Sequence, residues 1–217
     1  MNRLPLHQDL YLIAHDQSGK LLVHPASMGL GLAGAAMLEL ALAGRVAVAR
    51  GRVAASVPSR PAADPADAAD DFSGDLLALV TREPGDVRTP VKKAAGAAYE
   101  RTREALVAAG VLRRTTKRVM GLLPTTRYLI ADIASVVRAS SGARSAVEGW
   151  RQPDARCAAL CGLVAALRLE EELYLDQPSG RLAARLREIA REGSREVAEL
   201  VGVVETLVGE AAVAVYR

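Results

Sequence analysis

The stretch LVAAGVLRRTTKRVMGLLPTTRYLIAD, residues 106–132, carries the clearest structural pattern in the chain. Its first residues continue a helical repeat, and Gly110 stands where the C-terminus of a helix favours glycine. Two strand-like runs follow and meet near Gly121, which predicts a β-hairpin over residues 111–130. Helical spacing resumes at about residue 131. The stretch therefore predicts a helix, a hairpin and the start of a second helix.

The predicted tip of this hairpin is apolar and has a basic rim. Core segments rarely combine these features, because a buried helix would run longer without a proline and a solvent-exposed loop would not carry large apolar side chains at its tip. We therefore expect an apolar hairpin that protrudes and meets a partner. Its residues are the apolar Val119, Met120, Leu122 and Leu123, with Lys117, Arg118 and Arg127 beside them.

Charge is concentrated around the hairpin. Residues 86–127 contain ten Lys or Arg and three Asp or Glu, a net charge of +7, and the rest of the chain is −4. A basic segment in an otherwise mildly acidic protein indicates an anionic partner, either a membrane surface or nucleic acid. An ordinary solvated face remains an alternative at this stage.

The rest of the chain indicates a mainly α fold. Half of the residues are apolar and only 3% are aromatic, which favours helices over strands. No internal repeat is present, so we expect residues 1–217 to form a single-domain helical bundle with small β-hairpins. Proline and aspartate predict a surface loop at 58–74, and alternating valines predict a hairpin at 45–56. Periodicity predicts helices at 6–13, 27–43, 75–82, 89–109, 131–148, 154–175, 181–192 and 194–215.

Enzyme, metal and cofactor motifs are weak. GLGLAG at 29–34 fits a dinucleotide fingerprint, but Pro25 interrupts any preceding strand and residues 49–57 contain no acid. We interpret these glycines as sites of close helix packing. Three scattered histidines have no ligand spacing, and we interpret Cys157 and Cys161 as small buried hydrophobes. We therefore expect no catalytic residues, no metal and no cofactor.

The chain has no evident secretory or membrane-spanning segment. The N-terminus has charges and a proline where a signal peptide needs an apolar core, and the longest apolar run, Ala26 to Leu38, has 13 residues. We expect a cytoplasmic protein.

Two segments carry a resemblance to a known family. LAGAAMLELALAGRVAV at 32–48 and the stretch at 106–132 resemble the Golgi phosphoprotein 3 family, including its bacterial branch, and so do LYLIAHDQSGK at 10–20 and PDARCAALCGLVAAL at 153–167. The resemblance implies a helical peripheral membrane protein. Its eukaryotic members bind phosphatidylinositol 4-phosphate, retain membrane glycosyltransferases, and use an apolar hairpin for membrane insertion and self-association. It thus implies that residues 117–127 insert into a membrane or join subunits.

The headgroup pocket of the eukaryotic members is not preserved. Its tryptophan and three basic residues align with His24, Ala33, Gly96 and Tyr99 here. Instead, Lys92, Tyr99 and Arg103 fall on one helical stripe with Gly96 and form a candidate headgroup-binding site.

A winged-helix-like protein is the alternative, in which the basic hairpin would contact nucleic-acid phosphates. The apolar tip and the absence of a polar recognition helix before the hairpin count against it. The sequence therefore favours a peripheral adaptor that binds anionic phospholipid headgroups, and the resemblance implies that it holds membrane enzymes.

Overall fold

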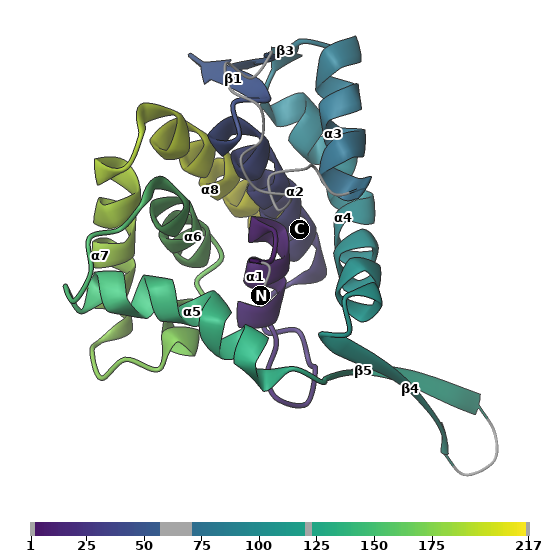
Figure 1. Cartoon of the computed structure of the whole chain (residues 1–217). Helices are drawn as coiled ribbons and strands as arrows, with labels where there is room; N and C mark the ends of the chain where they lie inside the picture. Colours follow the sequence, from purple (N-terminus) through teal and green to yellow (C-terminus); the bar gives the residue numbers. More distant parts are fainter. Residues whose placement is uncertain (1–2, 57–70, 120–122, 216–217) are drawn as a thin grey trace.

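The structure is a computed structural model that describes residues 3–56, 71–119 and 123–215. The prediction of a mainly α fold is confirmed, because eight α-helices account for most of these residues (Figure 1). The helices are α1 (Leu6–Ile13), α2 (Pro25–Leu42), α3 (Asp71–Arg82), α4 (Arg88–Ala108), α5 (Ile133–Val147), α6 (Ala155–Ala166), α7 (Ser179–Glu192) and α8 (Arg195–Val215).

Helix α2 is the centre of the packing. It contacts α1, α3, α4, α6 and α8, and its apolar residues surround the whole helix, which is typical of a core helix. Among the described residues it is the one helix long and apolar enough to span a bilayer, yet 78% of it is buried inside the protein. Burial by the surrounding helices therefore accounts for its apolar composition.

The glycines of α2 let neighbouring helices approach closely. A Cβ atom on Gly29 would lie 2.5 Å from the carbonyl oxygen of Ala95 on α4. A Cβ atom on Gly34 would lie 2.2 Å from the side chain of Val204 on α8, and one on Gly31 would lie 2.7 Å from that of Leu167. The interpretation of GLGLAG as a helix-packing segment is therefore confirmed.

The predicted hairpin at 45–56 is present but belongs to a larger sheet. Strand β1 (Val46–Ala49) pairs with β2 (Arg52–Ala55) around a turn in which Arg50 and Gly51 have φ of 53° and 73°, as a two-residue hairpin loop requires. A third strand, β3 (Gly85–Asp86), pairs with β2. Sequence analysis missed β3 because a strand of two residues is too short to show alternation of apolar and polar side chains.

The second hairpin projects away from the helices (Figure 1). Strands β4 (Leu112–Val119) and β5 (Leu123–Ile130) pair in antiparallel register from Leu112 with Ile130 to Val119 with Leu123. Among the described residues no third strand joins them. The chain thus reverses direction between residues 119 and 123, as predicted, although Met120, Gly121 and Leu122 lie outside the described residues.

The predicted start of α3 is wrong. Helix α3 begins at Asp71 rather than at residue 75, because Phe72 continues the buried repeat formed by Leu76 and Val80. The expected surface loop at 58–74 therefore overlaps α3 at its end, and its residues up to 70 lie outside the described residues. Helix α4 begins at Arg88, one residue before the predicted start, and the Asp86 carboxylate accepts the backbone N–H of Arg88 at 2.9 Å.

The predicted helix at 154–175 is also wrong in its second half. Helix α6 ends at Ala166, and Arg168 has a φ of 57°. A 3₁₀ helix, η2 (Glu170–Leu173), follows, and its Leu173 is buried. The chain leaves this helix at Tyr174, which has a φ of 50°. Leu169 and Leu173 are buried in the core, which a straight continuation of α6 does not provide.

Candidate functional site

Aromatic and basic side chains converge at the base of the β4–β5 hairpin. We call this group the aromatic-basic cluster. One member comes from α1, one lies two residues after the end of α1, two come from α4 and one comes from β5. They are Tyr11, His15, Tyr99, Arg103 and Tyr128.

A chain of hydrogen bonds connects the buried part of the cluster. The Nδ1–H group of His15 donates to the carbonyl oxygen of Tyr11 at 2.6 Å, so Nε2 of the neutral ring accepts from the hydroxyl of Tyr99 at 2.9 Å. The rings of His15 and Tyr11 stack with centroids 3.9 Å apart. Burial lowers the pKa of His15 below 6.5, because burial disfavours the charged imidazolium.

Arg103 joins α4 to the hairpin. Its guanidinium carbon lies 4.0 Å from the centroid of the Tyr128 ring and 5.6 Å from that of Tyr99, and it forms an ion pair with Glu100. Its side chain is 20% exposed. The cluster thus holds a permanent cation at the hairpin base, close to solvent.

The loop between α1 and α2 also packs on the hairpin. Gly19 has a φ of 78°, and a Cβ atom there would lie 2.3 Å from the carbonyl oxygen of Tyr128. The Asp16 carboxylate accepts the backbone N–H groups of Ser18 and Lys20, which closes the turn. The turn at residues 16–20 is therefore part of the hairpin base.

The predicted headgroup stripe is divided by the structure. Tyr99 and Arg103 lie together in the cluster, whereas Lys92 lies eleven residues earlier, about 16 Å away along α4. The Lys92 ammonium forms an ion pair with Glu210 on α8 at 3.3 Å. Gly96, between them, is exposed and has open space around it. His24 is exposed and caps α2 by accepting the N–H of Ala26.

The hairpin itself displays arginines. Arg113, Arg114 and Arg127 are exposed, and Thr115 pairs with Arg127. Because side chains alternate along a strand, Arg113 and Arg127 lie on the same face of the hairpin. The backbones of Lys117, Arg118, Val119 and Leu123 belong to the paired strands; Met120 and Leu122 lie outside the described residues.

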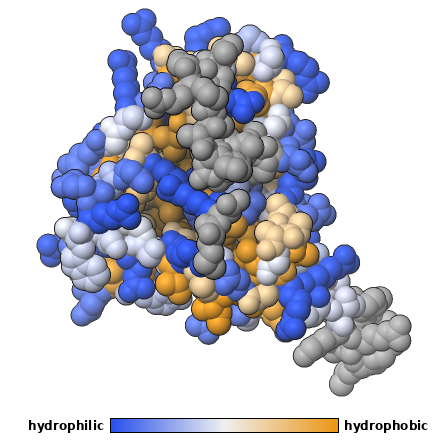
Figure 2. Space-filling model, in the orientation of Figure 1, coloured by the Kyte–Doolittle hydropathy of each residue, from blue (hydrophilic) through white to orange (hydrophobic). Residues whose placement is uncertain are grey.

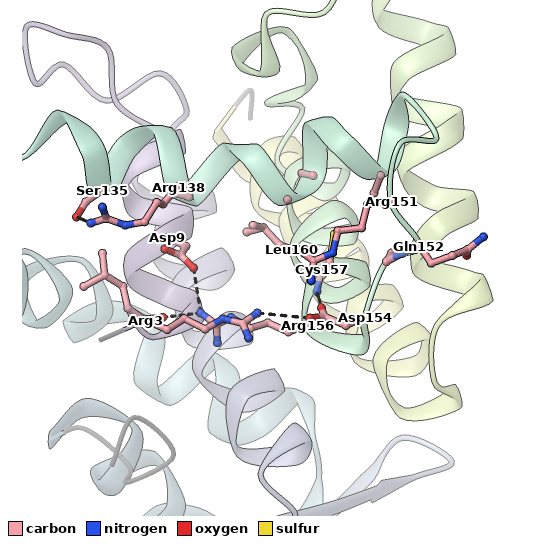
Figure 3. Close-up of a pocket in the computed structure, with 16 residues that line it drawn as sticks. Arg3, Asp9, Ser135, Arg138, Arg151, Gln152, Asp154, Arg156, Cys157 and Leu160 are labelled. Atoms are coloured by element: carbon pink, nitrogen blue, oxygen red, sulfur yellow. Dashed lines mark hydrogen bonds and ion pairs between the residues drawn. The ribbon is translucent and has the colours of Figure 1, made fainter. Parts of the chain in front are cut away.

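A separate pocket of about 240 Å³ lies between the N-terminal segment, α1, α5 and α6 (Figure 3). Its lining includes the arginines 3, 138, 151 and 156, with small apolar residues of α5 behind them. Cys157 is half-buried and lines this pocket, whereas Cys161 is fully buried. The prediction of two buried cysteines is therefore confirmed for Cys161 and wrong for Cys157.

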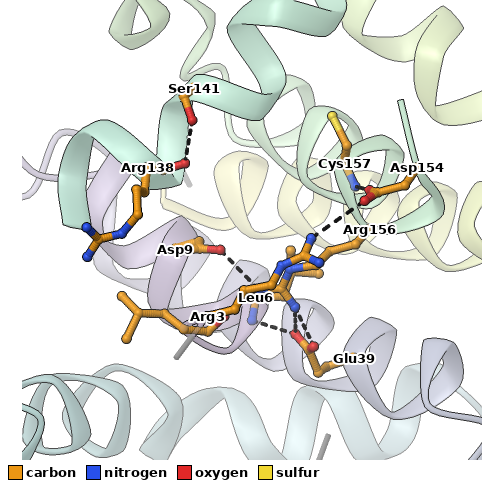
Figure 4. Close-up of polar contacts among 10 residues, drawn as sticks. Arg3, Leu6, Asp9, Glu39, Arg138, Ser141, Asp154, Arg156 and Cys157 are labelled. Atoms are coloured by element: carbon orange, nitrogen blue, oxygen red, sulfur yellow. Dashed lines mark hydrogen bonds and ion pairs between the residues drawn. The ribbon is translucent and has the colours of Figure 1, made fainter. Parts of the chain in front are cut away.

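Arg156 connects the elements around this pocket (Figure 4). Its guanidinium pairs with Glu39 of α2, with Asp9 of α1 at 3.0 Å, and with the carbonyl oxygen of Leu4 at 2.6 Å. The Glu39 carboxylate also accepts the N–H of Leu6, the first residue of α1. Since its donors are used within the protein, we interpret Arg156 as structural.

Sequence analysis missed Tyr11, His15 and Tyr128. Tyrosine is rare in this chain, and three of its five tyrosines converge here. The rarity of tyrosine could therefore have drawn attention to these residues in the sequence. Within the part of the chain that the structure describes, no three His, Cys, Asp or Glu side chains are grouped to hold a metal ion.

Comparison with known proteins identifies the family of the chain. No curated protein sequence matches the chain. The sequence model of the Golgi phosphoprotein 3 (GPP34) family matches residues 6–211, nearly the whole chain. The chain therefore belongs to the Golgi phosphoprotein 3 family.

Proposed function

We propose that this protein is a peripheral membrane protein that docks on anionic phospholipid through the β4–β5 hairpin. The observation that carries the proposal is a two-stranded hairpin that projects from the helical body and displays exposed arginines (Figure 1). Membership of the Golgi phosphoprotein 3 family supports it. A projecting basic hairpin gives an anionic surface access to its charges without unfolding any helix.

The hairpin tip would supply the apolar part of the contact. Burial of Val119, Met120, Leu122 and Leu123 in the acyl boundary would contribute on the order of 6–10 kcal/mol if all four left water completely. Partial insertion and ordering of the turn reduce this gain. Each nearby Lys or Arg, including Lys117, Arg118 and Arg127, adds about 1 kcal/mol over an anionic leaflet. Both contributions are needed for firm binding.

A phosphoinositide-like headgroup would be held at the hairpin base. Of the candidate residues Lys92, Tyr99 and Arg103, Arg103 is the best placed, because it is a cation beside the exposed arginines of the hairpin. The Tyr99 hydroxyl already interacts with His15, so we assign Tyr99 a supporting role. Lys92 would contact the membrane separately from Arg103. Retention of membrane enzymes is a further part of this proposal.

The test is co-sedimentation with vesicles of neutral phosphatidylcholine, of phosphatidylcholine with phosphatidylserine, and of phosphatidylcholine with phosphatidylinositol 4-phosphate. We expect binding to both anionic vesicles and none to the neutral one. A DNA mobility-shift assay at the same salt concentration tests the winged-helix alternative. Binding to DNA without binding to any vesicle would overturn the proposal.

The double variant Leu122→Ser, Leu123→Ser tests the tip. We expect weaker vesicle binding at every salt concentration, and the variant Val213→Ser, in an exposed apolar position on α8, serves as a control that binds normally. Mass in solution distinguishes insertion from self-association through the hairpin. If the wild type is oligomeric and the double variant is monomeric with intact vesicle binding, the hairpin serves assembly instead.

A further inference from the structure

Helix α5 exposes large apolar side chains beside the hairpin. Ile133 is 73% exposed and Val137 is 59% exposed. They stand four residues apart and therefore lie on the same face of the helix. Contiguous exposed apolar residues of this size indicate an interaction surface. Leu22, in the loop that packs on the hairpin base, is also exposed, at 37%.

One face of α5 packs against the protein and the opposite face is exposed to solvent. Its inner face is small and buried, with Ser135, Ala139 and Ala143 packed toward α1 and α6 or lining the pocket. Its outer face continues from Ile133 and Val137 to Arg144, which is exposed and within about 20° of Ile133 around the helix axis. The inner face already connects α5 to the protein, so the outer face is free for a partner.

The charge of this face fits an anionic surface. Helix α5 has no acidic residue in its fifteen positions, and Arg144 is the cation of its outer face. Its other arginine, Arg138, lies about 140° from Ile133 around the axis and lines the pocket. At the start of the helix, Asp132 caps α5 and pairs with Arg138 at 3.2 Å, while Asp16 closes its own turn. One acid, Glu148, follows the last residue of α5, at the end away from Ile133. Exposed aliphatic side chains with a cation beside them suit the boundary between headgroups and acyl chains, where the aliphatic groups leave water and the cation meets anionic headgroups.

The start of α5 is fixed to the base of the hairpin. Ile133 comes three residues after the end of β5, and the N–H groups of Ala131 and Asp132 both donate to the carbonyl oxygen of Val111. In Figure 1, the first turn of α5, the loop between α1 and α2, and the hairpin lie along the same lower side of the molecule, and Figure 2 shows hydrophobic groups on that side. The exposed residues of α5 thus begin next to the hairpin base.

We infer that the outer face of α5, formed by Ile133 and Val137 with Leu22 beside them, is a second membrane-contact element. This inference rests on the proposed function, and its partner is the interface of an anionic bilayer. Two separate contacts would restrict the tilt of the protein on the membrane more than a contact through the hairpin alone. Tyr174 is exposed as well, but its hydroxyl donates to Glu172, and Glu171 precedes that residue. Because these two acids would be repelled by an anionic bilayer, we leave η2 and Tyr174 out of the membrane-contact element.

The double variant Ile133→Gln, Val137→Gln tests this surface in vesicle binding. Both positions are exposed and glutamine favours helix, so we expect an unchanged melting temperature. We expect affinity for phosphatidylcholine–phosphatidylserine vesicles to fall about tenfold, because two aliphatic side chains no longer leave water. Val213→Gln on α8 is the matched control and should bind as the wild type does.

A fluorescence experiment locates the surface directly. In a Trp150→Phe background, which removes the only tryptophan, Val137→Trp should shift its emission to the blue when anionic vesicles are added. Val213→Trp in the same background should show no shift. A helix that stays in water would leave the emission of both reporters unchanged.

The outcomes separate the two proposals. If the wild type binds no anionic vesicle, the proposed function and this inference both fail. If the wild type binds and the α5 double variant binds equally well with no shift at position 137, only this inference fails. If the double variant changes the mass of the protein in solution and leaves vesicle binding intact, the face joins two copies of the chain and the inference is overturned.

Discussion

The guanidinium of Arg103 on α4 lies over the ring of Tyr128 on β5, with 4.0 Å between the guanidinium carbon and the ring centroid. This contact connects a core helix to the projecting hairpin. The arginine is also within 5.6 Å of the ring of Tyr99. This cation, in contact with two aromatic rings, is therefore one of the groups that hold the hairpin base, together with the loop at Gly19.

Removal of this cation should loosen the hairpin base. We expect Arg103→Ala to lower the free energy of unfolding by about 1–2 kcal/mol, because a partly desolvated cation–π contact and its packing are lost. Arg113→Ala, in an exposed position on the same hairpin, should change it by less than about 0.5 kcal/mol. Chemical denaturation of both variants checks this, and equal losses would contradict the role given to Arg103.

Stability should depend on pH through His15. Burial lowers the pKa of His15 in the folded protein below its value of 6.5. Between these two pKa values the unfolded chain binds a proton that the folded protein does not, so the free energy of unfolding falls as pH decreases through 6.5. We expect the melting temperature to fall from pH 7.5 to pH 5.5 in the wild type.

His15→Gln isolates this effect, because glutamine does not titrate. The variant should show a smaller fall in melting temperature over the same pH range. Burial raises the pKa of Asp9, which acts in the opposite sense at lower pH and is present in both proteins. The difference between wild type and variant therefore reports His15, and parallel curves would refute the prediction.

Two helical glycines should respond oppositely to alanine. Gly29→Ala places a Cβ atom 2.5 Å from a backbone oxygen of α4, and we expect a loss of about 1–3 kcal/mol from overpacking. Gly96→Ala on α4 has open space, and we expect a gain of about 0.5–1 kcal/mol, because alanine favours helix over glycine. Thermal unfolding measures both, and a stabilised Gly29→Ala protein would show that α2 and α4 do not pack as closely as described.

The hairpin arginines should control the salt dependence of membrane binding. We expect Arg113→Gln, Arg127→Gln to weaken binding to anionic vesicles about thirtyfold at low salt, from about 1 kcal/mol per cation, and to flatten its salt dependence. Arg181→Gln, Arg191→Gln on α7 removes two exposed cations elsewhere and should have little effect. If both double variants lose binding equally, total charge and not the hairpin determines the attraction.

Much of the fold could be predicted from local pattern. The helical repeat of α7, the glycine at 110 and the alternation around Arg50 and Gly51 each specify structure within a few residues. The predictions failed where distant contacts decide the backbone. Strand β3 has two residues and exists because β2 is beside it. The end of α6 at Ala166 depends on Leu169 and Leu173 being buried in the core.

The candidate site, too, was predicted from the sequence only in part. Sequence by itself determined the family, the helical class, the existence of the basic hairpin and the packing role of the α2 glycines, because each depends on residue type and spacing along the chain. Only the tertiary structure decided that Tyr11, His15 and Tyr128 meet Tyr99 and Arg103, and that Lys92 pairs with Glu210 instead. Helical spacing shows which residues share a face, but the neighbour that covers each part of that face depends on how α1, α8 and the hairpin pack against α4.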